Sequence, residues 1–137
     1  MTLLERLNKE DRFAKSIGAK LTEIREGYSR AELTVTETHL NGANVCQGGV
    51  LFTLADLAFA AVANSHHILS LGISNTIHYS SPANLGDHLV AECNEVINHK
   101  RLPYCNITIS NQKGEIIASM TGLAYRLRKE YSYDNLM

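Results

Sequence analysis

The chain has 137 residues, of which 45% are apolar and 20% charged, and its net charge is −1 at pH 7. These values are typical of an ordinary globular protein, and we treat residues 1–137 as one domain. The near-neutral charge argues against binding to nucleic acid or to anionic lipid surfaces. The sequence shows no secretory leader and no apolar run long enough to span a bilayer, so we expect a cytoplasmic protein.

The cysteines and histidines point to no metal site and no disulfide framework. The three cysteines, Cys46, Cys93 and Cys105, contain no C-x-x-C pair, and their odd number favours reduced thiols. The six histidines show no metal-ligand spacing with cysteines or carboxylates. We therefore expect no bound metal.

The apolar residues between Leu3 and Ile17 recur at helical spacing and predict a short N-terminal helix within residues 1–18. A polar loop is expected over residues 38–47, and a frayed tail over residues 128–137. The remaining segments alternate apolar and polar residues, as half-buried strands do, with a bulge expected at Glu95-Val96. The expected strands are Lys20–Glu26, Tyr28–Thr36, Gly72–Ser80, Asp87–Asn98, Arg101–Ser110 and Glu115–Leu127.

Between Gly49 and Ala63 the sequence is almost wholly apolar, and Asp56 is its only ionisable residue. Apolar residues fall on every side of a helix drawn through this run, which predicts a helix enclosed by protein. A buried carboxylate costs free energy unless it has a partner or a function. Gly48 and Gly49 would place unpaired backbone N–H groups at the start of this helix. One acid and such N–H donors are the minimum set for hydrolysing an activated acyl group.

A single apolar helix among many strands predicts an α+β fold. An antiparallel sheet of five or six strands can curve around the helix and cover most of it. One sheet leaves the far side of the helix open, so a second copy of the chain is expected to close it as a homodimer.

The segment from Leu40 to Asp56, LNGANVCQGGVLFTLAD, resembles the hotdog-fold thioesterases of the PaaI type. The family pattern is an Asn, a His-Gly-Gly six residues later, and an acid eight residues after the first Gly. Asn41, Gly48-Gly49 and Asp56 match this pattern, whereas Gln47 stands where the family usually has His. The segment Tyr79–Ala83 is similar to the family's connection between two strands. The resemblance covers about residues 10–127 and implies a long central helix wrapped by a curved antiparallel sheet.

The resemblance implies an acyl-CoA thioesterase that needs no cofactor, because a thioester is already activated. The Gly48 N–H would hold the developing oxyanion, and Asp56 would attack the carbonyl or activate a water; both routes stay open. Asn41 would orient the water or the carboxylate. Gln47 can donate a hydrogen bond but cannot carry a proton as His does. The residues expected to contact substrate are Gly49, Leu51 and Ser74, the last with its hydroxyl towards Asp56.

The spacing of Gly48 and Asp56 excludes a site within one chain. Eight residues of helix rise by about 12 Å, so both groups cannot touch one acyl carbon. Two antiparallel helices about a two-fold axis would bring Gly48 of one protomer to Asp56 of the other. The resemblance implies the same composite sites at a dimer interface, and dimers that pair into a homotetramer.

Three alternatives stay open. One is a non-catalytic protein that only binds acyl-CoA, and another is a hydratase or dehydratase of acyl thioesters. The latter uses a histidine together with an acid, and His39 is the only histidine near the loop. Lys100-Arg101 is expected to be a solvated turn between strands, with contact to the phosphates of coenzyme A as the other interpretation.

Overall fold

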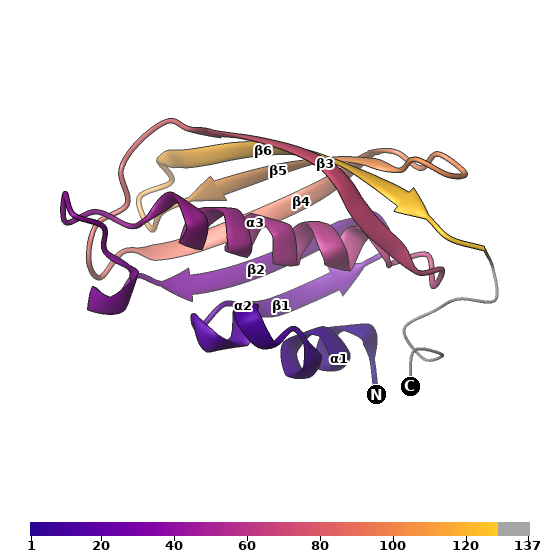
Figure 1. Cartoon of the computed structure of the whole chain (residues 1–137), viewed down its shortest axis with the longest axis horizontal. Helices are drawn as coiled ribbons and strands as arrows, with labels where there is room; N and C mark the ends of the chain where they lie inside the picture. The colour runs from indigo at the N-terminus through magenta and orange to yellow at the C-terminus, as the bar shows by residue number, and fades with distance from the viewer. Residues whose placement is uncertain (129–137) are drawn as a thin grey trace.

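The structure, a computed structural model, describes residues 1–128. Its long helix α3 (Gly48–Ala63) packs along one face of a curved six-stranded antiparallel sheet (Figure 1). The α+β arrangement of a central helix wrapped by a sheet is therefore confirmed. The helices within residues 1–128 are all too short or too polar to cross a bilayer. From residue 129 on, the expected frayed tail lies outside the described residues.

All six expected strands are present, with ends that differ by up to three residues from the expected ones. In the sheet they follow the order β1-β2-β4-β5-β6-β3, so β1 and β3 form the two edges. The expected bulge in β4 is confirmed by a register shift between Glu95 and Ile97. The strands are β1 (Lys20–Arg25), β2 (Tyr28–Thr34), β3 (Ser70–Tyr79), β4 (His88–Ile97), β5 (Tyr104–Ser110) and β6 (Ile116–Arg126).

The expected N-terminal helix is present but divided in two, α1 (Leu3–Glu10) and α2 (Arg12–Ser16). Asp11 separates them: its backbone is not helical, and its Oδ1 accepts a hydrogen bond of 3.2 Å from the Ala14 N–H. Aspartate is a strong N-cap residue, which explains why a second helix begins here.

The expected polar loop over residues 38–47 is more ordered than predicted. It begins with a short 3₁₀ helix, η1 (Glu37–His39), and is closed by a single bridge between Leu40 and Cys46. The buried His39 ring accepts from the Thr36 N–H at 3.0 Å and contacts the Ile17 carbonyl at 2.8 Å through Nε2. A carbonyl oxygen only accepts, so Nε2 donates and both ring nitrogens are used.

In the core between α3 and the sheet, the Phe59 ring packs against two glycines of the sheet, Gly72 and Gly122. A Cβ atom added at Gly122 of β6 would lie 2.9 Å from this ring, and one added at Gly72 of β3 would lie 3.3 Å from it. Phe59 is almost completely buried. The two glycines therefore let the ring approach the sheet closely at one point along α3.

One face of α3 is not covered by the described part of its own chain, as expected for a helix whose far side one sheet leaves open. Ten of its sixteen residues are buried against the sheet and the N-terminal helices. The residues that remain partly or fully exposed recur at the spacing of one helical face. They are the first residue, Gly48, and then Gly49, Phe52, Thr53, Asp56 and Ala60, and we call the last five the open stripe.

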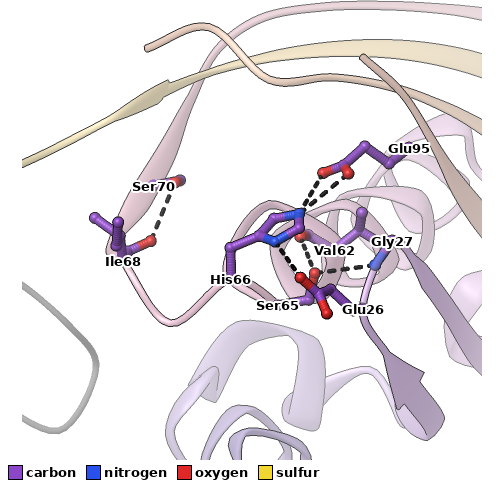
Figure 2. Close-up of polar contacts among 8 residues, drawn as sticks. All are labelled: Glu26, Gly27, Val62, Ser65, His66, Ile68, Ser70 and Glu95. Carbon is purple, nitrogen blue, oxygen red and sulfur yellow. Dashed lines mark hydrogen bonds and ion pairs between the residues drawn. The ribbon is translucent and has the colours of Figure 1, made fainter. Parts of the chain in front are cut away.

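The residues that follow α3 contact the turn of the β1–β2 hairpin and strand β4 (Figure 2). The His66 ring lies between two carboxylates, with Nδ1 2.9 Å from Glu26 and Nε2 3.0 Å from Glu95. Both contacts are hydrogen bonds only when the ring carries a proton on each nitrogen, because a carboxylate accepts and does not donate. Beside them, the Gly27 N–H donates to the Ser65 hydroxyl at 3.2 Å, which in turn donates to the Val62 carbonyl.

Candidate active site

A cavity of about 420 Å³ lies at the N-terminal end of α3. It forms where the loop before α3, the first turns of α3 and the end of β3 meet. Three of the predicted site residues, Asn41, Gly48 and Leu51, line it together. Tyr79 and the segment 80–83 complete the wall.

Gly48 is the first residue of α3, and its N–H donates no hydrogen bond within residues 1–128. The Tyr79 hydroxyl donates to the Gly48 carbonyl at 3.1 Å, and a Cβ atom at position 48 would lie 3.0 Å from the Tyr79 ring. Glycine is thus the residue that fits beneath this ring without displacing it. The arrangement leaves an unpaired N–H at a helix N-terminus beside a cavity, which is a favourable place for an anionic oxygen.

Gln47 is the N-cap of α3. Its Oε1 accepts a hydrogen bond of 2.6 Å from the Gly49 N–H, and a Cβ atom at Gly49 would lie 2.5 Å from that oxygen. The Gly49 N–H is therefore engaged by Gln47 and is not free to contact a substrate. Because the capping bond uses only the side-chain oxygen, the Nε2 amino group of Gln47 is left as a donor near the cavity.

Asn41 holds the loop that forms one wall of the cavity. Its Oδ1 accepts from the N–H groups of Ala43 at 2.8 Å and Val45 at 3.3 Å. The backbone N–H of Asn41 donates to the Val45 carbonyl at 2.8 Å. The side-chain oxygen is thus used for the turn, and its amino group is the part of the amide left for a bound molecule.

Asp56 lies on the open stripe of α3, two turns beyond Gly48, and does not line the cavity. Within residues 1–128 its carboxylate has no hydrogen bond and no ion pair, so a single chain does not supply the donors expected around it. Burial raises the pKa of Asp56, and the negative charge of Asp11 raises it further. The rise of the helix separates Asp56 from Gly48 by about 12 Å.

Ser74 does not face Asp56 in this chain. A bulge follows Gly72, and beyond it Ser74 is opposite Leu123 while Asn75 is opposite Gly122. Gly122 faces the Phe59 ring of α3, so Asn75 occupies the side of β3 towards α3 and Ser74 the other side. The bulge shifts the alternation by one residue, and no periodicity in the sequence marks it.

Tyr79 and residues 80–83 are site residues that the sequence pattern does not assign to the site. The one signal for them is the similarity of Tyr79–Ala83 to the family's connection between two strands. Cys46 also lines the cavity, but burial raises the pKa of its thiol to about 11. A thiol with that pKa is protonated at neutral pH and is a poor nucleophile.

Two further expectations concern metal binding and the Lys100-Arg101 turn. No group of three or more His, Cys, Asp and Glu side chains suited to a metal ion occurs in the part of the chain that the structure describes. Lys100 and Arg101 lie in the bend between β4 and β5, as expected, with Lys100 exposed. The Arg101 side chain is held more firmly than expected, because its Nη1 donates to the Leu127 carbonyl at 3.2 Å and reaches the Arg126 carbonyl at 3.5 Å. The sequence could not show this, because the contact joins segments 25 residues apart.

Residues 43–118 match the family model described as "Thioesterase superfamily", a range that includes Gly48, Asp56 and Tyr79. A protein of Archaeoglobus fulgidus that carries an esterase name is 40% identical over 124 residues, which cover 90% of this chain and 80% of that protein. The acyl-coenzyme A thioesterase PaaI of Escherichia coli is 34% identical over 119 residues, which cover 87% and 85%. The solved structure of E. coli PaaI superposes with a TM-score of 0.86 at 30% identity, covering 93% of this chain and 97% of that one.

Proposed function

Because this chain belongs to the thioesterase superfamily, and within it to the hotdog-fold proteins of the PaaI type, we propose that it hydrolyses acyl-CoA thioesters to a free acid and coenzyme A. The similar E. coli protein is named for this activity. The observation that carries the proposal is a pair of complementary groups that have no partner within residues 1–128. One is the Gly48 N–H at the cavity, and the other is the Asp56 carboxylate on the open stripe.

The two groups meet when a second protomer covers the open stripe. In an antiparallel pair of α3 helices about a two-fold axis, Gly48 of each protomer lies beside Asp56 of the other. The edge strand β3 supports this arrangement, since its Leu71 and Ile73 side chains are 54% and 57% exposed in one chain. Covering large exposed apolar side chains and an unpaired strand edge favours association. The functional unit is therefore a homodimer with two composite sites, and pairing of dimers into a tetramer is part of the same proposal.

In the composite site the Gly48 N–H polarises the thioester carbonyl and holds the oxyanion that develops on it. The amino group of Asn41 is a further donor at the cavity, and that of Gln47, which does not line the cavity, comes from the residue next to Gly48. Asp56 of the other protomer either attacks the carbonyl carbon or removes a proton from an attacking water. Leu51 and Tyr79 form the wall that the acyl group contacts. The chemistry uses no metal and no organic cofactor.

The local electrostatics support this division of roles. Asp56 has to be ionised to act, yet within one chain burial and the charge of Asp11 both raise its pKa. Hydrogen-bond donors that belong to the other protomer lower the pKa of a carboxylate when they face it. Assembly of the dimer is thus expected to activate the acid as well as to position it.

The hydratase alternative has less support, because both ring nitrogens of His39 are engaged by Thr36 and Ile17. A histidine without a free nitrogen cannot transfer protons to a substrate. Measuring the release of free thiol distinguishes hydrolysis from binding alone, because only hydrolysis frees the coenzyme A thiol. We expect thiol release from at least one of a panel of short, medium and aromatic acyl-CoA compounds, and no water addition to an enoyl-CoA.

The catalytic acid is tested by Asp56→Asn, which should lower kcat by about 100-fold or more, the size typical of losing a catalytic acid or base. Glu37→Gln, an exposed carboxylate at the start of the loop, is the matched control and should leave the rate unchanged. A rate within a few-fold of the parent protein after Asp56→Asn would remove Asp56 from the mechanism.

The composite site is tested by mixing two inactive variants, Asp56→Asn and Gly48→Pro. Proline at the first position of a helix is tolerated but has no N–H to donate. Random exchange gives half heterodimers, each with one intact site, so about a quarter of the parent activity should return. No recovery, although the subunits exchange, would mean that both groups act within one chain.

A further inference from the structure

The peptide group between Gly48 and Gly49 is held at both of its polar atoms by side chains. Its carbonyl oxygen, on Gly48, accepts a hydrogen bond of 3.1 Å from the Tyr79 hydroxyl. Its N–H, on Gly49, donates a hydrogen bond of 2.6 Å to Oε1 of Gln47. Because a peptide group is planar, fixing the directions of its N–H and its carbonyl fixes the orientation of the whole group.

The preceding peptide group, between Gln47 and Gly48, is held through its carbonyl. The Gln47 carbonyl accepts a hydrogen bond of 3.0 Å from the Val50 N–H, and the Gln47 N–H donates one of 2.8 Å to the His39 carbonyl. The remaining polar atom of this peptide group is the Gly48 N–H beside the cavity, which donates no hydrogen bond within residues 1–128. Two fixed peptide planes meet at the Gly48 Cα atom, so both backbone torsions of Gly48 are determined.

Position 48 needs such support more than most positions in a helix. Glycine has a wider range of backbone torsions than any other residue, because it has no Cβ atom. Gly48 is also the first residue of α3, and the N–H groups of the first turn of a helix have no partner within that helix. A donor stabilises a developing negative charge best when its direction is set before the reaction, since no free energy is then spent on reorienting it.

Tyr79 is itself held by the sheet. It is the last residue of β3 and lies opposite Ala118 of β6. The next two N–H groups, those of Ser80 and Ser81, both donate to the Ile117 carbonyl, at 2.9 and 3.2 Å. The hydroxyl therefore reaches the first turn of α3 from a backbone that is anchored on β6, outside the helix that it holds.

We propose that Tyr79 is a positioning residue, whose hydroxyl, together with the Gln47 cap, sets the direction of the Gly48 N–H towards the thioester oxygen. The inference rests on the proposed function, because the role that it assigns belongs to that reaction. The Tyr79 ring forms part of the cavity wall, and the hydroxyl adds a second role that can be separated from the first. Removing the hydroxyl alone leaves the wall and the donor in place but frees the peptide between Gly48 and Gly49 to rotate.

Tyr79→Phe separates the two roles, because phenylalanine keeps the ring and loses only the hydroxyl. We expect kcat for an acyl-CoA to fall by about 5- to 10-fold, the loss that corresponds to one hydrogen bond, with KM within about two-fold of the parent value. KM is spared because the oxyanion develops only in the transition state.

Tyr28→Phe is the matched control for the loss of a tyrosine hydroxyl. The Tyr28 hydroxyl donates to Glu92 at 2.6 Å. The neighbouring Ser29 donates to the Ala58 carbonyl of α3, so Tyr28 lies on the opposite face of the sheet from the helix. Tyr28→Phe should therefore change neither kcat nor KM.

Relaxation of the Gly48 amide, measured by ¹⁵N NMR, tests the positioning itself, whether or not the protein hydrolyses anything. In the parent protein this amide should have an order parameter of about 0.85, typical of rigid backbone, and in Tyr79→Phe the value should fall towards about 0.6. Tyr28→Phe should leave the Gly48 amide as rigid as in the parent protein.

The two measurements together decide the proposal. A Gly48 amide that stays rigid in Tyr79→Phe would refute it, even if kcat falls, because the hydroxyl would then act on the substrate directly. A mobile amide with an unchanged kcat would also refute it, since the direction of the N–H would not matter for the reaction. If the amide becomes mobile in Tyr79→Phe while the parent protein hydrolyses no acyl-CoA, the proposed function fails and the positioning of Gly48 by Tyr79 stands.

Discussion

The Tyr79 hydroxyl donates a hydrogen bond to the Gly48 carbonyl, and its ring lies over the position where a side chain at residue 48 would begin. This contact fastens the end of β3 to the first turn of α3. It therefore fixes the wall of the cavity relative to the backbone N–H of Gly48, which donates no hydrogen bond within residues 1–128. A residue 31 positions away in the sequence thus defines how close a substrate can approach Gly48.

Replacing Gly48 by alanine should impair catalysis without unfolding the protein. The added Cβ would lie 3.0 Å from the Tyr79 ring, so the ring has to move into the cavity. We expect kcat/KM to fall by about 10-fold or more, while the melting temperature changes little because alanine is the better helix former. Gly42→Ala is the control, because a Cβ atom there meets nothing within 4 Å. Combining Gly48→Ala with Tyr79→Ala should restore part of the activity; no coupling between the two changes would disprove the steric explanation.

Replacing Gln47 by glutamate separates its two roles. Glutamate keeps an oxygen for the Gly49 N–H and adds a negative charge at the helix N-terminus, so stability should be maintained or increased. It also removes the Nε2 donor and places an anion near the developing oxyanion, so kcat should fall. Gln47→Ala removes the donor without adding a charge, so kcat should fall less than in Gln47→Glu, while the lost cap should cost about 1 kcal/mol in the free energy of unfolding. Chemical denaturation and thiol-release kinetics measure the two effects; a stable and fully active Gln47→Glu variant would exclude Gln47 as a donor.

The sequence was sufficient for the order of elements and for the position of the apolar helix, because hydrophobic periodicity is local. It was also sufficient to place Asn41 and Gly48 beside each other, since they flank one loop. It did not reveal that Asp11 ends one helix and begins another, because a capping aspartate looks like any polar residue on a helix surface. The approach of Tyr79 to Gly48 depends on strand pairing, which one sequence does not specify.

The pH dependence of the reaction should report the charge of Asp11. Burial and the Asp11 carboxylate both raise the pKa of Asp56 in one chain, so the acid limb of kcat/KM should respond to the charge at position 11. Asp11→Asn keeps an N-cap for α2 but removes the charge, and the limb should move to lower pH. Glu10→Gln makes the same change of charge one residue away and should shift it less. An unchanged limb in Asp11→Asn would show that the two carboxylates are not coupled in the assembled enzyme.

The same raised pKa predicts how Asp56 affects stability. A carboxyl group whose pKa is higher in the folded state binds protons more tightly there, so its contribution to stability is greatest at low pH and is lost as pH rises through the raised pKa. Asp56→Asn cannot ionise and avoids this loss. We therefore expect the variant to melt at a higher temperature than the parent protein at neutral pH, with the difference vanishing below about pH 3.

The two carboxylates around His66 should contribute very differently to stability. The Glu95 side chain is 11% exposed and the Glu26 side chain 74% exposed. Glu95→Gln should therefore lower the free energy of unfolding by about 1.5–3 kcal/mol, the range for a charged hydrogen bond that is lost in a buried place. Glu26→Gln is the matched change at the surface and should cost at most about 1 kcal/mol. Denaturant titration at neutral pH compares the two, and equal losses would contradict the burial argument.

The packing of Phe59 against Gly72 and Gly122 limits which substitutions these positions can accept. Because the ring rests on bare backbone at Gly72 and Gly122, a side chain gained at either position leaves no room for it. Among natural homologues, substitutions at these glycines should be accompanied by a smaller residue at position 59. The three positions are thus expected to mutate as a unit, although they belong to three separate elements of the chain.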